Sequence, residues 1–191
     1  MSNTATSTVS LASSPPANYC SIYYVTPTGA GTFDGTSISN AASATTLPAV
    51  LSAVGCGGAT IKMAVGTYSI TNSLSLNSNT TIEGGYKNDA TFSVKYSMDN
   101  ASPTTTYITI IRRDIYNPEA SKNIIPINVT GAASNFRLQD LRIELPGATP
   151  IGSNPINPAS SQQNNFGVYL GAGCVNYNIV RCYIDGGKGA N

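Results

Sequence analysis

A ten-residue segment occurs twice in this chain, and this repeat constrains the fold more than any other feature. Residues 135–144 (NFRLQDLRIE) align without a gap on residues 176–185 (NYNIVRCYID). The same offset pairs residues 127–129 with residues 168–170, and a looser third copy covers residues 74–84. Hydrophobic type is retained at four aligned pairs, namely Phe136/Tyr177, Leu138/Ile179, Leu141/Cys182 and Ile143/Ile184. Repeats of this length are typical of chains that stack one supersecondary unit on the next.

Each copy has the pattern of two short strands joined by a bend. Phe136 and Leu138 alternate with polar residues, and so do Leu141 and Ile143. Because the step from Leu138 to Leu141 is odd, a bend at residues 139–140 is needed to keep all four side chains on one face. The sequence therefore predicts an all-β fold, a parallel β-helix (solenoid) in which residues 135–144 stack on residues 176–185. An antiparallel sandwich is the alternative, but it gives no reason for similarity position by position.

Composition points to an extracellular protein. Only 10% of the 191 residues are charged, the net charge is +1, and the chain is rich in uncharged polar residues. The small net charge argues against nucleic acid or an anionic membrane as the partner, and no apolar run is long enough to cross a bilayer. We therefore expect a secreted or cell-surface protein that neither binds nucleic acid nor inserts into a membrane.

The two ends of the chain suggest a piece of a longer protein. Residues 1–18 are rich in Ser and Thr, and we expect them to form a disordered linker or an added tail. Residues 19–191 are expected to form the N-terminal cap and the first coils of the solenoid. Because nothing resembling a cap follows Asp185, we expect further coils beyond residue 191.

A short helix is expected at residues 46–54 (TLPAVLSAV). Thr46 is a candidate N-cap, Pro48 falls in the first turn, and Gly55 is a stop signal. The helix has one apolar face, made by Leu47, Val50, Leu51 and Val54. We expect it to cover the first end of the stack, where unpaired strand edges otherwise invite aggregation.

The N-terminal part also carries a family resemblance. A strand at residues 22–25, the helix, GTY at residues 66–68 and GGY at residues 84–86 together resemble the start of pectin-lyase-like proteins, particularly large bacterial adhesin-like surface proteins. The resemblance implies a right-handed parallel β-helix whose first coil closes at GTY and whose second ends at GGY. It says little about activity, because the superfamily includes lyases, hydrolases, phage tail fibres and adhesins.

The best candidate site is an outward-facing pair of carboxylates. The chain has no histidine, so the usual serine and cysteine triads are excluded. Glu144 and Asp185 occupy equivalent repeat positions, and stacked coils place such residues about 4.8 Å apart. This pair either raises one pKa or binds a hard cation such as calcium. Arg142 and Tyr183 lie beside it, and the alternative is an ordinary solvated surface with an incidental ladder of charges.

Other residues are weaker candidates. Asp140 is expected to face Arg181 in the next coil, and Asp89 and Asp99 are possible calcium ligands. The pectate-lyase branch of the superfamily uses carboxylate-bound calcium and a basic residue on an outer face, but this chain has no counterpart of its catalytic motif. We therefore expect no required cofactor, with calcium as an optional ligand.

Two long polar segments, residues 87–107 and 146–165, are expected to be loops thrown out from corners of the coils. The second contains four prolines, so no helix runs through it. Its amide side chains suit hydrogen bonding to a glycan or a protein surface, and the candidate ligand residues there are Asn154, Asn157, Gln162 and Gln163.

Four cysteines in a chain of secreted type allow disulfides. Cys20 and Cys56 flank the first strand and the helix, so a disulfide between them is the main candidate. A Cys174–Cys182 disulfide is less favoured, because Cys182 occupies the core position of Leu141. Buried free thiols are the alternative, and zinc is excluded by the absence of histidine and of C-x-x-C spacing.

These features predict an adhesive or structural segment of a large surface protein, a monomer that displays loops to carbohydrate or to another surface protein. One alternative is the N-terminal part of a polysaccharide lyase or glycoside hydrolase, in which a calcium-assisted active site lies beyond residue 191. A second alternative is a phage-type tail fibre, which would trimerise. We expect no catalysis by this chain alone.

Overall fold

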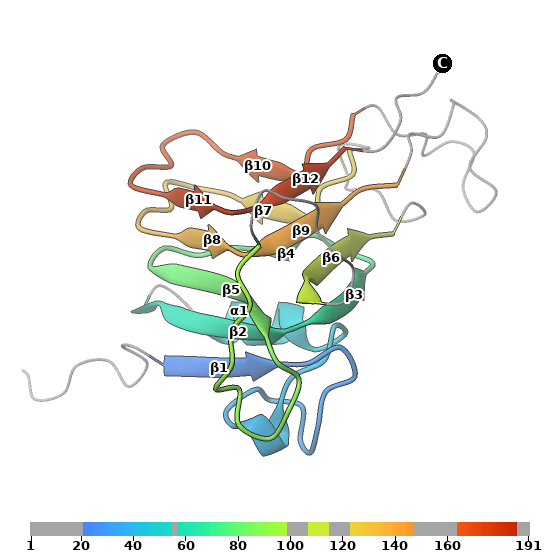
Figure 1. Ribbon diagram of the computed structural model, residues 1–191. Coiled ribbons are helices and arrows are strands. Elements are labelled where there is room, and N and C mark those ends of the chain that lie inside the picture. The colour runs from blue at the N-terminus through green and yellow to red at the C-terminus, as the bar shows by residue number, and fades with distance from the viewer. Residues whose placement is uncertain (1–20, 55–56, 99–106, 115–122, 147–163, 187–191) are drawn as a thin grey trace, which may run out of the picture.

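Three parallel β-sheets make the scaffold of the computed structural model, which describes residues 21–54, 57–98, 107–114, 123–146 and 164–186 (Figure 1). The five-stranded sheet has, in order, β1 (Ser21–Val25), β2 (Ala59–Ala64), β5 (Thr80–Tyr86), β8 (Arg137–Gln139) and β11 (Asn178–Val180). The four-stranded sheet has β3 (Gly66–Ile70), β6 (Thr109–Arg113), β9 (Leu141–Glu144) and β12 (Tyr183–Asp185). The three-stranded sheet has β4 (Leu74–Ser75), β7 (Ile127–Val129) and β10 (Val168–Leu170).

The chain visits the three sheets in turn. From β2 to β12, successive strands belong to the five-stranded, the four-stranded and the three-stranded sheet, and this order then repeats. We call each round a layer: β2–β4, β5–β7, β8–β10, and β11 with β12. The colours of Figure 1 run from blue at one end of the stack to red at the other, so the layers follow one another along one direction. The prediction of a mostly β, parallel architecture is thus confirmed.

The repeat sets the register between layers. Leu138 pairs in parallel with Ile179, Ile143 with Ile184, and Ile127 with Val168. The looser third copy is also aligned as predicted, since Ile82 pairs with Leu138 and Leu74 with Ile127. The predicted parallel stacking of residues 135–144 on residues 176–185 is confirmed.

The predicted bend falls at Asp140, between β8 and β9. Asp140 has a φ of 55°, and Arg181, at the same corner one layer on, has a φ of 48°. A left-handed residue turns the chain sharply, which lets the apolar residues on both sides of the corner face the same core. Aspartate tolerates this conformation better than most residues do.

A second corner, before β5, β8 and β11 of the five-stranded sheet, uses asparagine. Asn79, Asn135 and Asn176 have φ values of 59°, 58° and 53°. The Asn135 side chain donates a hydrogen bond from Nδ2 to Asn79 Oδ1 over 3.2 Å. Asparagine is one of the few residues other than glycine that adopt this conformation readily, so these three layers turn here in the same way.

The inward side chains of all three sheets fill one apolar core. Ile61, Ile82 and Leu138 line up across the five-stranded sheet, and each is fully buried. Burying a side chain of this size contributes roughly 1.5–3 kcal/mol. The last described layer differs: Ile179, directly beside the buried Leu138, is 40% exposed. The reason is that no described strand pairs with the outer edge of β11.

The N-terminal helix, α1 (Leu47–Val54), confirms the sequence prediction. Its four apolar residues are buried and belong to the same core as the sheets. Thr46 occupies the N-cap position, because its carbonyl accepts from Ala49 N (3.0 Å) and Val50 N (3.1 Å). Its hydroxyl, however, accepts from Ser43 N (2.9 Å) and not from an amide of the first turn. The helix contacts β4, the strand at one edge of the three-stranded sheet.

A 3₁₀ helix, Ile38–Asn40, precedes α1. Within the described ranges, neither helix is long and apolar enough to cross a membrane. The tail at residues 1–18 and the stop signal Gly55 lie outside the described residues.

Two of the four cysteines can be placed. Cys174 and Cys182 are free thiols, so the less favoured disulfide between them is wrong. Cys182 is half-buried at the position equivalent to Leu141, and burial raises the pKa of its thiol. The main candidate pair, Cys20 and Cys56, lies outside the described residues and stays a prediction.

Candidate functional site

The four residues predicted at the site lie together on the outer side of the four-stranded sheet. Tyr183 of β12 pairs with Arg142 of β9, and Asp185 pairs with Glu144. Ile143, between Arg142 and Glu144, is fully buried, so its two neighbours point outward. The predicted register and the outward direction of Glu144 and Asp185 are therefore confirmed. We call Arg112, Arg142, Glu144, Tyr183 and Asp185 the binding face.

Arg112 belongs to the binding face but was missed in the sequence. It lies on β6, in register with Glu144. Its Nη2 and Nε atoms lie 2.7 and 2.8 Å from Glu144 Oε2. Arg112 and Glu144 are 32 residues apart, whereas the later layers repeat at 41 residues, as Asp140 and Arg181 do. A comparison at one constant offset therefore could not find Arg112, and residues 109–113 (TIIRR) do not alternate between apolar and polar residues in a way that would point it outward.

Arg142 lies among three groups of the binding face. Its Nε atom is 2.8 Å from Glu144 Oε1, and its Nη2 atom is 3.6 Å from Asp185 Oδ2. Its guanidinium carbon lies 5.3 Å from the centroid of the Tyr183 ring, a cation–π contact. The Nε contact is an ion pair without hydrogen-bond alignment, because this buried atom has no hydrogen-bond partner. The face thus combines two arginines, two carboxylates and one half-exposed aromatic ring.

This arrangement changes the chemistry expected of the two carboxylates. Glu144 is held between two guanidinium groups, and Asp185 also faces Arg142. At these distances the guanidinium groups compete with a cation for the carboxylate oxygens. Among the residues that the structure describes, no group of three or more Cys, Asp or Glu side chains is placed to hold a metal ion.

Of the remaining predicted site residues, the structure describes Asp89 and leaves five outside the described ranges. Asp89 lies in a local turn, where its Oδ1 accepts from Thr91 Oγ1 (2.8 Å) and Thr91 N (2.9 Å). It also pairs with Lys87 over 3.2 Å. The hydrogen bonds from Thr91 are the main cause that lowers the pKa of Asp89 to about 2. Outside the described residues, and so still predictions, are Asp99, Asn154, Asn157, Gln162 and Gln163.

The described ends of both long insertions meet the four-stranded sheet, which carries the binding face. Residues 87–108 lead from β5 into β6, and residues 145–167 lead from β9 to β10. In a parallel sheet all strands begin at one edge and end at the other. One insertion therefore meets the four-stranded sheet where its strands begin, and the other leaves it where they end. The face lies between them.

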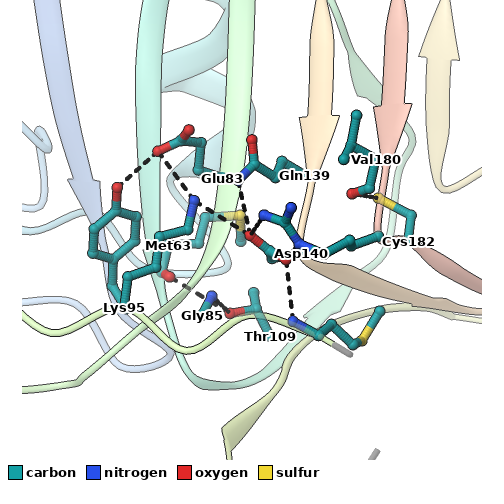
Figure 2. A network of polar contacts seen from close by, with 12 residues as sticks. Met63, Glu83, Gly85, Lys95, Thr109, Gln139, Asp140, Val180 and Cys182 are labelled. Carbon is teal, nitrogen blue, oxygen red and sulfur yellow. Dashed lines mark hydrogen bonds and ion pairs between the residues drawn. The ribbon is translucent and has the colours of Figure 1, made fainter. Parts of the chain in front are cut away.

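The described part of the first insertion is fixed by a buried charge (Figure 2). The Asp140 side chain, 1% exposed, accepts hydrogen bonds from Arg181 Nε (2.6 Å) and Nη2 (2.8 Å). It also accepts from Met98 N (3.1 Å) and lies 3.3 Å from Lys95 Nζ. Burial opposes ionisation of Asp140, but hydrogen bonds from Arg181, Gln139 and Met98 outweigh it and hold its pKa well below the usual range.

Lys95 and Tyr86 extend this network over the five-stranded sheet. Lys95 Nζ lies 3.5 Å from Glu83 Oε2, which accepts a hydrogen bond from the Tyr86 hydroxyl (2.7 Å). Lys62 and Lys95 both lie over the Tyr86 ring, 5.2 and 5.4 Å from its centroid. The described start of the insertion is therefore packed on the sheet.

Gly85 allows the insertion to pack this closely. Tyr96 N donates to Gly85 O over 2.7 Å, and Gly85 has a φ of 84°. A Cβ atom at this position would collide with the Tyr96 carbonyl oxygen. The second glycine of the GGY sequence is therefore needed because the backbone of Tyr96 passes too close for a side chain.

Comparison with known proteins adds no identity. No family model, no curated protein and no solved structure matches this chain. The resemblance described for residues 66–68 and 84–86 therefore remains an expectation.

Proposed function

We propose that this chain is an adhesive and structural segment of an extracellular surface protein, built as a right-handed parallel β-helix. In this proposal the binding face and the two insertions beside it hold a carbohydrate. The observation that carries the proposal is the position of the binding face, with its two arginines and exposed tyrosine, between the two longest connections of the fold.

The β-helix is supported by the order of the strands. In such a fold each coil contributes one strand to each of three parallel sheets, and inward side chains stack on their equivalents in the next coil. The visits of β2 to β12 to the three sheets follow this order. Crossovers between parallel strands of one sheet are right-handed in about 98% of cases, which favours the right-handed form.

A stiff scaffold suits a structural role. The layers from β2–β4 to β8–β10 are hydrogen-bonded to one another through all three sheets, the last described layer is joined through two, and the core is continuous from α1 to that layer. Bending such a stack would break strand pairing on one side, so its outer faces keep their geometry. A binding face on a rigid element is already ordered, so it loses less conformational entropy when it binds a partner.

The chemistry of the face favours a polyhydroxylated partner. The Tyr183 side chain, 49% exposed, offers a ring for stacking on a sugar. The arginine and carboxylate groups of Arg112, Arg142, Glu144 and Asp185 offer donors and acceptors for hydroxyl groups. Because two positive charges offset two negative charges, the face has little net charge and suits a neutral saccharide better than a highly charged one.

A glycan array tests this proposal. The 191-residue chain should bind a set of neutral glycans, and Tyr183→Ala should reduce the signal about tenfold or more, because stacking on the ring is lost. Tyr169→Ala is the matched control, since Tyr169 is a tyrosine of the three-stranded sheet with similar exposure, 41%. Equal loss in both variants, or no binding by the unmodified chain, would contradict the proposal.

A further inference from the structure

A second surface feature lies on another sheet. An open pocket of about 600 Å³ lies beside the outer side of the five-stranded sheet. Its polar lining comes from three neighbouring strands and from the asparagine corner before them, and includes Thr81, Asn135, Arg137, Asn176, Tyr177 and Asn178. Pockets of about 300–1,000 Å³ are typical of small-ligand sites.

Arg137 occupies the middle of this pocket. It pairs with Thr81 on one side and with Asn178 on the other, so the three side chains form a row across β5, β8 and β11. The next residue, Leu138, is fully buried, which directs Arg137 to the outside of the sheet. The guanidinium is therefore flanked by a hydroxyl and an amide, which carry no charge.

Arg137 differs from every other arginine that the structure describes. The others each meet a carboxylate or a backbone carbonyl, and they are Arg112, Arg113, Arg142 and Arg181. Among the described residues, Arg137 has neither an ion pair nor a hydrogen bond of its side chain, and its Nε atom is buried without an acceptor. A buried donor without an acceptor is uncommon and destabilising, and a ligand that accepts from it would order this side chain.

The rest of the lining is neutral and rich in amides. No carboxylate lines the pocket. Asn135 is held by its hydrogen bond to Asn79, whereas the side chains of Asn176 and Asn178 have no protein partner within the described residues. Each of these amides offers both a donor and an acceptor to a ligand.

We propose that this pocket binds an acidic sugar residue. The carboxylate or sulfate of the sugar pairs with the Arg137 guanidinium, whose planar donors match such groups in bidentate fashion. Ring hydroxyls then bond to the amides of Asn176 and Asn178. The amides and the open shape favour a hydroxylated ring over a peptide, which would need an apolar slot or a strand edge. This site is independent of the binding face, which lies on a different sheet and suits a neutral saccharide.

The first experiment maps binding by NMR on the 191-residue chain, following the Arg137 Nε–H and the Asn176 and Asn178 side-chain signals. The probes are a glucuronate-containing tetrasaccharide without sulfate, a sulfated tetrasaccharide without carboxylate, and neutral cellotetraose. We expect at least one acidic probe to shift these signals saturably, with a Kd of roughly 1 mM. The two acidic probes identify which anionic group is recognised. Absence of shifts with both, equal shifts with cellotetraose, or shifts centred on Arg112 and Arg142 would overturn the proposal.

The second experiment uses variants. Arg137→Gln should weaken binding of the acidic probe about tenfold or more, because the paired charge is lost. Asn178→Asp retains Arg137 but places a carboxylate in register beside it, and should weaken binding to a similar extent in a folded chain. Lys62→Gln is the control, because Lys62 is a cation of the same sheet that does not line the pocket, and it should bind as the unmodified chain does. Unchanged affinity in Arg137→Gln or in Asn178→Asp would contradict the proposal.

Discussion

Asp140 and Arg181 occupy the same corner of two neighbouring layers and face each other through two hydrogen bonds of 2.6 and 2.8 Å. Both residues have a left-handed backbone conformation. Because the two layers turn in the same way, an acidic side chain in one layer lies against a basic side chain in the next. Asp140 also receives Lys95 and the Met98 amide from the first insertion. One buried carboxylate therefore joins β8–β9, β11–β12 and the insertion beside the binding face.

The first prediction concerns this charge. Asp140→Asn should lower the free energy of unfolding by about 2–3 kcal/mol, because the charge-assisted hydrogen bonds of Arg181 to the buried carboxylate are lost. Asparagine also tolerates the left-handed conformation, so backbone strain is not the cause of the loss. Urea denaturation measures it. The control is Asp185→Asn, whose half-exposed ion pair should contribute no more than about 1 kcal/mol. Similar losses in the two variants would contradict the anchoring role of Asp140.

The second prediction is a loss of stability in acid. The pKa of Asp140 is lowered in the folded state, so its contribution is complete above the unfolded pKa, about 3.9, and disappears as the pH falls toward the folded value. The free energy of unfolding should therefore fall between about pH 5 and pH 2. Asp140→Asn should flatten this fall, whereas Asp89→Asn, at an exposed carboxylate, should leave most of it. An unchanged slope in Asp140→Asn would place the acid sensitivity elsewhere.

The sequence predicted most of the layer geometry, for a simple physical reason. Where two layers are separated by one constant offset, alternate apolar positions fix both the register and the face of each residue. Ile143 and Ile184, or Glu144 and Asp185, could therefore be paired without coordinates. The bend at residues 139–140 followed from the odd step between Leu138 and Leu141, whereas the left-handed conformation of Asp140 was not predicted.

The parts that were missed depend on insertions. Arg112 reaches Glu144 across a layer whose length differs from the repeat, so no offset aligned them. Lys95 reaches Asp140 only because the insertion folds back over the five-stranded sheet, a tertiary contact without a local signal. Parity placed Glu144 and Asp185 side by side, with Arg142 next to them, and suggested calcium, but it could not show that Arg112 also reaches Glu144.

The third prediction compares equivalent positions in adjacent layers. Leu138→Ala should destabilise the chain by about 2–5 kcal/mol, because it opens a cavity in a fully buried site. Ile179→Ala, directly beside it and 40% exposed, should cost about 1 kcal/mol or less. Thermal and urea unfolding measure both. An equal cost would mean that another chain or further residues cover the last described layer.

The fourth prediction is that this chain does not cleave polysaccharides. Glu144, the best-placed carboxylate, is held between two guanidinium groups, and the sequence contains no histidine to act as a base. Incubation with polygalacturonate or alginate, with calcium added, should release no unsaturated or reducing ends above the blank. Turnover that disappears in Glu144→Gln would reverse this conclusion and favour an enzyme.

The last prediction separates the second insertion from the binding face. Both ends of this insertion are anchored: Leu145 N donates to Asp185 O over 2.9 Å, and Ile124 N donates to Asn164 O over 3.0 Å. The ends also meet, because Asn165 Nδ2 donates to Pro146 O over 3.1 Å. Replacing residues 147–163 by a short Gly-Ser turn should therefore leave the unfolding temperature within a few degrees of the original, since closing a shorter loop costs little.

Glycan binding by the shortened chain then shows where the partner is held. If the insertion contacts the glycan, affinity should fall about tenfold or more while the fold remains intact. Tyr183→Ala, made in the chain that retains residues 147–163, measures the contribution of the binding face separately. Loss in both variants is expected, because the insertion leaves the sheet at the edge where β9 and β12 end. Full binding by the shortened chain would confine the site to Arg112, Arg142, Glu144, Tyr183 and Asp185.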